Sequence, residues 1–323
     1  MKENSIYISV VIPLYNKQNA IAATLRSVLA QTYTNYEIIV VDDGSTDDSA
    51  NVAEAVLREC TVYDIECKCK VIRKANGGVC SARNRGIQEA KYDYIALLDG
   101  DDMWDEHYLE EQVKLIQDFP EAKMWGVNYA DIVDGKIYPY QQGMGENFRG
   151  YVEDYFGTSH GDLFLPSAIV LDKNVTSEIG LFDERMAYSE DLDFWYRVIL
   201  NAKVVFFNKS LAYYNKDAEN RAEQNFYAHF DIKKRIYYYA DKYVQYFEKD
   251  PSFAKFISLH IAWGILNGDY YFGDKYDREA TDKIIKYLAY EHMPYKYRLI
   301  FRTPRFIGRI VYELTKLLKK IKS

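Results

Sequence analysis

The sequence has few of the residues that proteins use to build zinc centres. Its five histidines are scattered, and none has a partner at the spacing of a helical His-Glu-x-x-His site. Of its four cysteines, Cys67 and Cys69 alternate along a predicted strand, and no second pair lies at zinc-binding spacing. We therefore expect no zinc site, and interpret the thiols as core-facing side chains in a reducing cytoplasm. The other two cysteines are Cys60 and Cys80.

Long hydrophobic runs are absent too. No stretch reaches the roughly 18 uncharged apolar residues of a membrane-spanning helix, so the sequence predicts none. Residues 1–4 lead into a short β-like run without a cleavage pattern, so we expect no secretory signal peptide. Signatures of P-loop proteins, of G-x-S-x-G hydrolases and of dinucleotide-binding proteins are also missing. These absences favour a cytoplasmic protein outside those enzyme classes.

Positive charge is concentrated at the C-terminal end, where acidic residues are nearly absent. Residues 294–323 carry nine Lys or Arg and one acid, a net +8, which leaves −15 for the rest of a chain whose total is −7. An acidic body is a poor partner for nucleic acid, so none is expected. Apolar residues recur at helical spacing within 294–323, which predicts a basic amphipathic helix. That helix could lie on an anionic membrane surface or pack against protein, and both alternatives stay open.

The first 120 residues alternate between short apolar runs and stripes of helical period. This pattern predicts βαβ units, and therefore an α/β fold with a mostly parallel sheet flanked by helices. Ligands of such sheets bind beyond the carboxyl ends of the strands, where two acidic clusters are expected. Strands are predicted at 8–13, 37–41, 65–72 and 94–98, and helices at 21–29, 52–57 and 79–90.

The pattern becomes mixed after residue 120. Asp134 and Gly135 separate two β-like runs and predict a hairpin turn. Residues 165–171 are apolar and predict a strand, and a helix is expected to begin near Ser189. Beyond about residue 217 the chain is predicted to be helical to its end.

The acidic cluster at the end of the fourth predicted strand contains Asp99, Asp101 and Asp102, with Gly100 allowing a tight turn. Three neighbouring carboxylates repel one another unless a cation neutralises them. Oxygen ligands of this kind suit Mg²⁺ or Mn²⁺ shared with a substrate's phosphates. The alternative is a solvated turn in which Asp102 or Asp105 caps the next helix.

Two further segments could hold a nucleotide. Asp42 and Asp43 end the second predicted strand, and a carboxylate can accept a hydrogen bond from the ring N–H of uracil or guanine. The alternative is a turn in which Ser45 or Thr46 caps the following helix. The second segment is a glycine loop that opens a helix; its backbone N–H groups and guanidinium suit phosphate or ribose, although a plain turn would look similar. Its candidate residues are Asn76, Gly77 and Arg83.

Asp191 lies in the first turn of the helix that is expected to begin near Ser189. The helix dipole and free N–H groups should keep this carboxylate ionised, which suits a general base at neutral pH. The alternative is an acid that merely favours the start of a helix.

Six segments in this order and spacing resemble glycosyltransferase family 2, whose members have the GT-A fold. The resemblance covers roughly residues 6–215, and the combination is more specific than any single motif. The segments are VIPLYN at 11–16, VVDDGSTD at 40–47, NGG at 76–78 with ARN at 82–84, LLDGDD at 97–102, GLFDE at 180–184 and SEDLDFW at 189–195.

The resemblance implies a role for each matching residue. Pro13, Tyr15 and Asp43 match positions that hold the nucleotide base, with Asp42 beside them. Asp99 and Asp101 match the DxD motif: Asp101 would bind the metal on the diphosphate, Asp99 would hold the ribose side, and Asp102 would support them. Asp191 matches the catalytic base.

The implied activity is inverting transfer of a hexose or N-acetylhexosamine from a nucleotide diphosphate sugar, UDP-sugar above all, to a glycan or lipid-linked acceptor. The leaving diphosphate needs a cation, Mn²⁺ or Mg²⁺, and the acceptor hydroxyl needs a base. The GT-A domain would span 1–216, with the donor side at about 6–120 and the acceptor side at about 121–216. Residues 217–323 would form a helical extension, and the basic helix could hold the protein at the inner face of the cell membrane.

Two other functions remain alternatives. A sugar-1-phosphate nucleotidyltransferase has a similar fold, but it would need a glycine- and arginine-rich loop directly after the first strand. Tyr15, Asn16, Lys17 and Gln18 occupy that position, which argues against this class. A non-catalytic nucleotide-sugar-binding protein is the second alternative, and the intact acidic residues disfavour it.

Overall fold

The computed structural model describes residues 5–58, 68–141, 143–157, 163–186, 189–219 and 242–267, with single positions at 295, 298 and 307. The chain divides into two compact units, the first made of 1–155 with 159–227 and the second of 156–158 with 228–323. The expected domain boundary near residue 216 stays a prediction, because residues 220–241 lie outside the described part.

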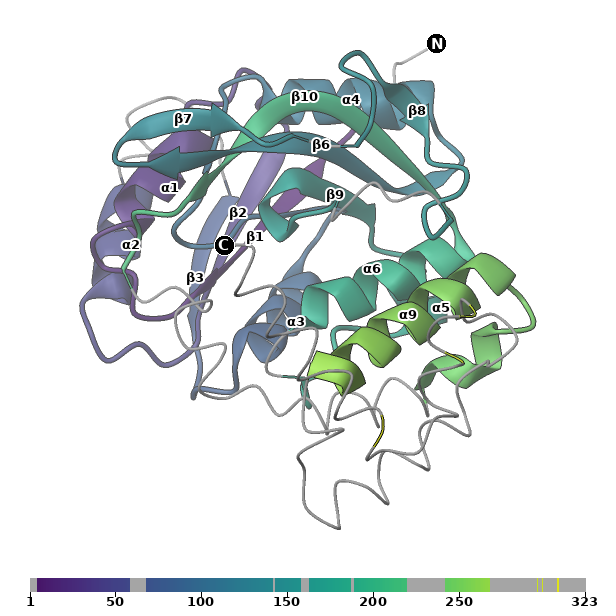
Figure 1. The fold of residues 1–323 in the computed structure, drawn as a ribbon. Helices are drawn as coiled ribbons and strands as arrows, with labels where there is room; N and C mark the ends of the chain where they lie inside the picture. Colours follow the sequence, from purple (N-terminus) through teal and green to yellow (C-terminus); the bar gives the residue numbers. More distant parts are fainter. Residues whose placement is uncertain are drawn as a thin grey trace. The chain divides into compact units, whose positions relative to one another are not determined.

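One sheet organises the first unit (Figure 1), and in the described residues its main path runs β3-β2-β1-β4-β9-β6-β10-β5. β7 pairs with β6, and β8 pairs with β10. The first four strands of the path are parallel, as are β6 and β10, whereas β9 is antiparallel to both of its neighbours. The strands are β1 Ile8–Leu14, β2 Tyr36–Asp42, β3 Lys68–Arg73, β4 Tyr94–Leu97, β5 Met103–Trp104, β6 Ala122–Val133, β7 Lys136–Pro139, β8 Arg149–Tyr151, β9 Ile169–Asp172 and β10 Lys203–Asn215.

Helices cover both faces of the N-terminal part of the sheet. Successive residues of a strand point to opposite faces. Val10 belongs to the core cluster that contains Leu25 of α1, whereas Val11 meets Gly86 of α3 on the other side. β1 is therefore buried on both faces, which explains its continuous apolar run. The helices are α1 Ile21–Leu29, α2 Ser49–Arg58, α3 Val79–Glu89, α4 Tyr108–Asp118, α5 Val175–Ile179 and α6 Glu190–Asn201.

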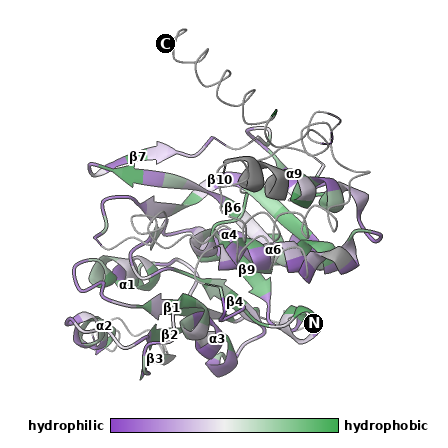
Figure 2. Cartoon of the chain, turned by 60° about the horizontal axis from the view of Figure 1, so that its bottom comes forward, coloured by the Kyte–Doolittle hydropathy of each residue, from purple (hydrophilic) through white to green (hydrophobic). Residues whose placement is uncertain are grey.

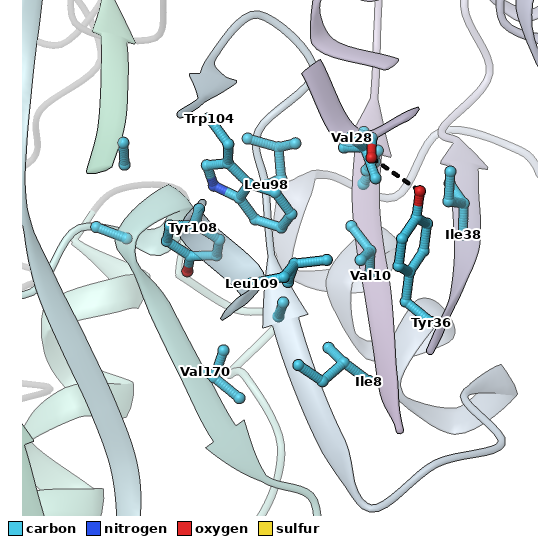
Figure 3. Packing of buried hydrophobic residues seen from close by; sticks show 14 of the residues in the cluster. Ile8, Val10, Val28, Tyr36, Ile38, Leu98, Trp104, Tyr108, Leu109 and Val170 are labelled. Carbon is cyan, nitrogen blue, oxygen red and sulfur yellow. Dashed lines mark hydrogen bonds between the residues drawn. The ribbon is translucent and has the colours of Figure 1, made fainter. Parts of the chain in front are cut away.

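The core on the α1 side joins residues from distant parts of the sequence (Figure 3). Trp104 and Tyr108 stack with ring centroids 4.1 Å apart. The Tyr36 hydroxyl, although buried, donates a hydrogen bond of 2.9 Å to the carbonyl of Val28, so its polar atom is satisfied. Figure 2 shows hydrophobic colour along β9 and hydrophilic colour on the outer side of α3, as expected for a buried strand and a surface helix.

The register of the parallel strands brings the acidic clusters to one edge. Leu14 at the end of β1 is paired with Asp42 at the end of β2, and Val11 is paired with Leu97 at the end of β4. Residues 42–43 and 99–102 therefore leave the sheet at the same carboxyl edge. This is the placement that the sequence predicted, because the carboxyl ends of parallel strands meet at one edge.

Most predicted elements are confirmed within the described residues. The hairpin turns at Asp134 and Gly135, between β6 and β7. Two details differ from the predictions. The first is that the expected strand at 165–171 begins with a 3₁₀ turn, Pro166–Ala168, before β9. The second is that neither Ser45 nor Thr46 caps the helix that follows. That helix, α2, begins at Ser49, whose N–H donates to the Asp47 carboxylate at 3.0 Å. Cys60 and Cys67, with the start of the third predicted strand, lie outside the described residues.

The second unit contains a hydrophobic helix, α9 Pro251–Asn267. Asp250 precedes it, and its carboxylate accepts hydrogen bonds from the Phe253 N–H and the Ser252 hydroxyl. Phe253 packs against Tyr243 and Phe156 within the same unit. No described helix is both long and apolar enough to cross a membrane. The predicted basic helix at 294–323 lies outside the described residues, apart from helical positions at 295, 298 and 307.

Candidate active site

The end of β1 and the loop that follows it contribute the first residues of the site. Pro13 is buried in β1, and a side chain at Gly100 would come within 3.0 Å of the Pro13 carbonyl, so glycine permits this close approach. Tyr15 is 46% exposed and stands at the edge of the sheet, where a planar ligand could contact its ring. Asn16 has a left-handed backbone, and its side-chain oxygen accepts a hydrogen bond of 2.8 Å from the Thr46 N–H. The loops after β1 and β2 are thus fastened together.

Asp43 holds the glycine loop in place. Its carboxylate accepts hydrogen bonds from the N–H groups of Gly77 and Gly78, at 3.0 and 2.7 Å, and from the Lys74 ammonium. Asp43 is only 2% exposed, so these contacts occupy much of its hydrogen-bonding capacity. Its expected role in holding the base stays a prediction, and the structure adds an internal role in shaping the loop.

The turn after Asp42 packs tightly against the glycine loop through Gly44. Asp42 accepts a hydrogen bond of 3.3 Å from the Ser45 N–H. Gly44 has a φ of +74°, and a side chain there would come within 2.8 Å of the Asn76 N atom. Asn76 and Gly77 themselves are exposed, so the loop offers polar groups to solvent beside Asp42.

The three aspartates after β4 differ strongly in their surroundings. Both carboxylate oxygens of Asp99 accept from one nitrogen of Arg83, Nη2, at 2.8 and 3.2 Å. Asp101 accepts a hydrogen bond of 2.5 Å from the Lys17 ammonium. Asp102 is fully buried and accepts from the Ser167 hydroxyl and the Asn215 N–H. Burial, followed by repulsion from Asp101 and Asp99, raises the pKa of Asp102 well above its usual range.

The chemistry of Asp99 and Asp101 fits a divalent metal better than that of Asp102. Mg²⁺ and Mn²⁺ prefer oxygen ligands and are commonly held by one or two carboxylates together with substrate phosphates. In the described part of the chain no three Asp, Glu, His or Cys side chains converge into a metal site. Asp99 and Asp101 would supply the two carboxylates of the arrangement in which substrate phosphates provide the other oxygen ligands. Asp102, whose oxygens are used inside the protein, is suited to supporting the loop.

Asp191 is the second residue of α6, which begins at Glu190 directly after the left-handed residue Ser189. We expected the helix terminus to keep this carboxylate ionised, but the structure corrects that view. Burial and the neighbouring charge of Glu190 raise the pKa of Asp191 to about 7, and Arg83 only partly opposes them. Desolvation therefore outweighs the helix terminus at this position. A carboxyl with such a pKa can take up and release a proton near neutral pH.

Arg83 connects the aspartate cluster to the start of α6. Its guanidinium is 3% exposed and donates to both Asp99 and Glu190, each at 2.8 Å. The same group lies over the ring of Phe182, with 5.5 Å to the centroid. Arg83 is therefore enclosed by internal partners. Its expected contact with phosphate or ribose stays a prediction.

Some residues of the site were not predicted from the sequence. Ser167 donates to Asp102 and accepts a hydrogen bond of 3.1 Å from the Asp99 N–H, so it fixes two members of the cluster. It sits in an apolar run, which gave no signal of this role. Lys17 contacts Asp101, and its place just beyond β1 at the carboxyl edge is the sequence signal that could have indicated this role.

The segments that form this sheet edge match a known protein family. The model of the family named "Glycosyl transferase family 2" matches residues 9–171, which include the acidic clusters after β2 and β4 but not Glu190 and Asp191. The chain belongs to glycosyl transferase family 2. Family membership places it among the glycosyltransferases, and the sequence-based resemblance is confirmed.

Two relatives illustrate this membership of family 2. Glycosyltransferase GlyG of Streptococcus pneumoniae serotype 4 is 29% identical over 229 residues, covering 65% of this chain and 70% of GlyG. An uncharacterised glycosyltransferase of Rickettsia typhi is 31% identical over 216 residues, covering 64% of this chain and 63% of that protein. The matches thus span about two thirds of each relative.

Solved structures confirm the fold expected for a family 2 glycosyltransferase. Residues 1–349 of TarS from S. aureus, crystallised with UDP-GlcNAc, match with a TM-score of 0.70 and 20% sequence identity. The match covers 89% of this chain and 83% of that chain. The α/β fold with a mostly parallel sheet and flanking helices is therefore the GT-A fold.

Proposed function

We propose that this chain transfers a hexose or N-acetylhexosamine from a UDP-sugar to a hydroxyl of a glycan or lipid-linked acceptor, with inversion at the anomeric carbon. The observation that carries the proposal is the meeting of Asp42, Asp99 and Asp101 at one sheet edge, with Arg83 linking Asp99 to the segment that bears Asp191. TarS, which shares the fold, was crystallised with UDP-GlcNAc and with UDP, which supports the choice of UDP as the first nucleotide to test.

The donor would lie across the carboxyl edge. Tyr15 offers an exposed ring to the base, and Asp42, at the end of β2, would accept from the ring N–H of that base. The exposed side chain of Asn76 would meet phosphate or ribose oxygens, since the Gly77 and Gly78 N–H groups donate to Asp43. Asp99 and Asp101 would hold a divalent metal, which supplies positive charge for the departing diphosphate. Gly100 lets the loop that bears Asp99 and Asp101 pack closely on the Pro13 carbonyl, which keeps both carboxylates at the carboxyl edge.

Asp191 would act as the general base. As the acceptor oxygen bonds to the anomeric carbon, its proton passes to the Asp191 carboxylate, and the bond from that carbon to the diphosphate oxygen breaks. The nucleoside diphosphate leaves with the bonding electrons. Attack from the face opposite the leaving group inverts the anomeric carbon. A positioned base of this kind contributes about 10²–10⁴-fold to a rate.

Calorimetric titration tests the donor half of the proposal. UDP and GDP are each titrated, with and without Mn²⁺, into the wild type, Asp101→Ala and the control Asp118→Ala, whose side chain pairs with Arg149 at the surface. We expect Mn²⁺-dependent binding of UDP that Asp101→Ala loses and Asp118→Ala keeps. Preference for GDP would contradict the choice of nucleotide, and no binding of either nucleotide would contradict the proposed function.

A further inference from the structure

The Lys17 ammonium occupies the position on Asp101 that a metal ion would need. Lys17 Nζ lies 2.5 Å from Asp101 Oδ2 and 3.1 Å from the carbonyl oxygen of Glu219. Both side chains are 15% exposed, so small ions can reach them from solvent. The described partners of the ammonium are therefore oxygen atoms that could also attract another cation, and one of them belongs to a predicted metal ligand.

Two cations cannot share this oxygen closely. Divalent metals such as Mg²⁺ bind carboxylate oxygens at about 2.1 Å, which is comparable to the separation already used by Lys17. A metal on Asp101 Oδ2 would thus lie next to the ammonium, and like charges at that distance repel strongly in a partly desolvated site. Either the metal stays away or the ammonium moves.

Lys17 is built so that its head can move while its backbone stays fixed. Its N–H donates to the Ser49 hydroxyl at 2.7 Å, and its carbonyl accepts from the N–H groups of Ala20 and Ile21 at the start of α1. The ammonium, by contrast, sits at the end of a flexible four-carbon stem, and within the described residues it contacts Asp101 and the Glu219 carbonyl. A rotamer change would release Asp101 without disturbing the loop.

We propose that Lys17 is a mobile donor-binding residue, whose ammonium neutralises Asp101 in the free enzyme and moves to the diphosphate when a divalent metal binds Asp101. The inference rests on the proposed function for the metal and the diphosphate. It assigns the lysine two successive anionic partners, first a carboxylate and then phosphate oxygens. The metal and the donor should therefore bind together better than the metal binds alone.

The proposal predicts effects of opposite sign for one substitution. In Lys17→Met the competitor is gone, so Mn²⁺ alone should bind at least about tenfold more tightly, which is the size of one charge-assisted contact. With saturating Mn²⁺, UDP should bind about tenfold more weakly, because the ammonium that meets its phosphates is missing. A purely structural lysine would instead weaken both titrations together.

The measurement is Mn²⁺ binding by electron paramagnetic resonance, without nucleotide, followed by UDP calorimetry at saturating Mn²⁺. Lys123→Met is the matched control, because Lys123 forms a comparable pair with Asp172 at 2.7 Å away from the site. Lys17→Gln, which keeps a polar side chain without charge, serves if Lys17→Met melts early. Both Lys17 variants should show the crossed pattern, and Lys123→Met should match the wild type.

Unchanged or weaker Mn²⁺ binding in both Lys17 variants would overturn the proposal, as would unchanged UDP affinity. Failure of the wild type to bind UDP with Mn²⁺ would instead contradict the proposed function. The comparison of Mn²⁺ alone would still decide whether Lys17 competes for Asp101. The two ideas can therefore fail separately.

Discussion

Arg83 Nη1 lies 2.8 Å from Glu190 Oε1, and this contact ties the helix after the glycine loop to the helix that carries the proposed base. The other nitrogen of the same guanidinium holds Asp99. A single buried cation thus sits between the proposed donor carboxylates and Asp191. Because it opposes the rise in the pKa of Asp191, Arg83 influences both where the base lies and when it is ionised.

Loss of Arg83 should destabilise the first unit strongly. Arg83→Ala leaves Asp99 and Glu190 without their shared partner, and breaking a buried ion pair costs about 3–5 kcal/mol. We expect the free energy of unfolding to fall by about 3 kcal/mol, near the lower end of that range because Asp99 is partly exposed. Urea denaturation followed by circular dichroism measures it.

The matched control for this prediction is Arg73→Ala. Arg73 is 52% exposed and pairs with Glu54 on the surface, where such a pair contributes about 0–1 kcal/mol. An equal loss in the free energy of unfolding for both variants would show that the buried Arg83 contacts stabilise the fold no more than a surface pair does.

Asp191→Asn should separate binding from chemistry. The amide keeps nearly the same shape but cannot accept the acceptor's proton, so transfer should fall by about 10²–10⁴-fold while UDP binding changes little. Product formation from a UDP-sugar gives the first quantity and calorimetry the second. The control is Asp118→Asn, because Asp118 pairs with Arg149 and with none of the described site residues. This variant should keep both the transfer rate and the UDP affinity near the wild-type values. Transfer by Asp191→Asn at a near-normal rate would show that another group removes the proton.

The rate of transfer should rise with pH around neutrality. Asp191 has a pKa raised to about 7, so the carboxylate that accepts the proton predominates only above that pH. Below the midpoint, kcat should fall by about tenfold for each pH unit. The profile is measured between pH 5.5 and 8.5 (roughly one to two units either side of the midpoint) with saturating donor. A flat profile across this interval would indicate a carboxyl with an ordinary pKa.

Gly86→Ala should destabilise the fold through packing alone. A Cβ at this position would lie 2.2 Å from Val11 Cγ1, so α3 must move away from β1 or Val11 must change its rotamer. Overpacking of this kind costs about 1–3 kcal/mol. Thermal or urea unfolding tests it against Gly145→Ala, whose new Cβ would have no neighbour within 4 Å. Equal stability of both variants and the wild type would show that α3 and β1 can move apart at little cost in free energy.

Sequence patterns predicted the sheet and its carboxyl edge because their signals are local. Apolar runs that are buried on both faces, such as β1, stand out against amphipathic helices, and the ends of parallel strands must share an edge. The partners of the acidic residues depend on tertiary packing and were not predictable in this way. Ser167 comes from a 3₁₀ turn inside an apolar run, and it reaches Asp102 only because β9 inserts beside β4.

The same reason explains the incorrect expectation for Asp191. Sequence position placed it in the first turn of a helix, where a carboxylate is ordinarily stabilised. It could not show how far the carboxyl is removed from water or that Glu190 adds its own charge. Desolvation depends on what packs around a group, and that information is spread over the whole chain.

The position of β9 also shapes how the protein is made. β4 ends at Leu97, yet its second neighbour in the sheet is β9, Ile169–Asp172. Translation proceeds at about 5–20 residues per second, so a nascent chain would carry an unpaired β4 edge for several seconds. Unpaired edges are templates for wrong pairing with other chains. The edge of β4 is therefore open to wrong pairing during synthesis until β9 emerges and pairs with it.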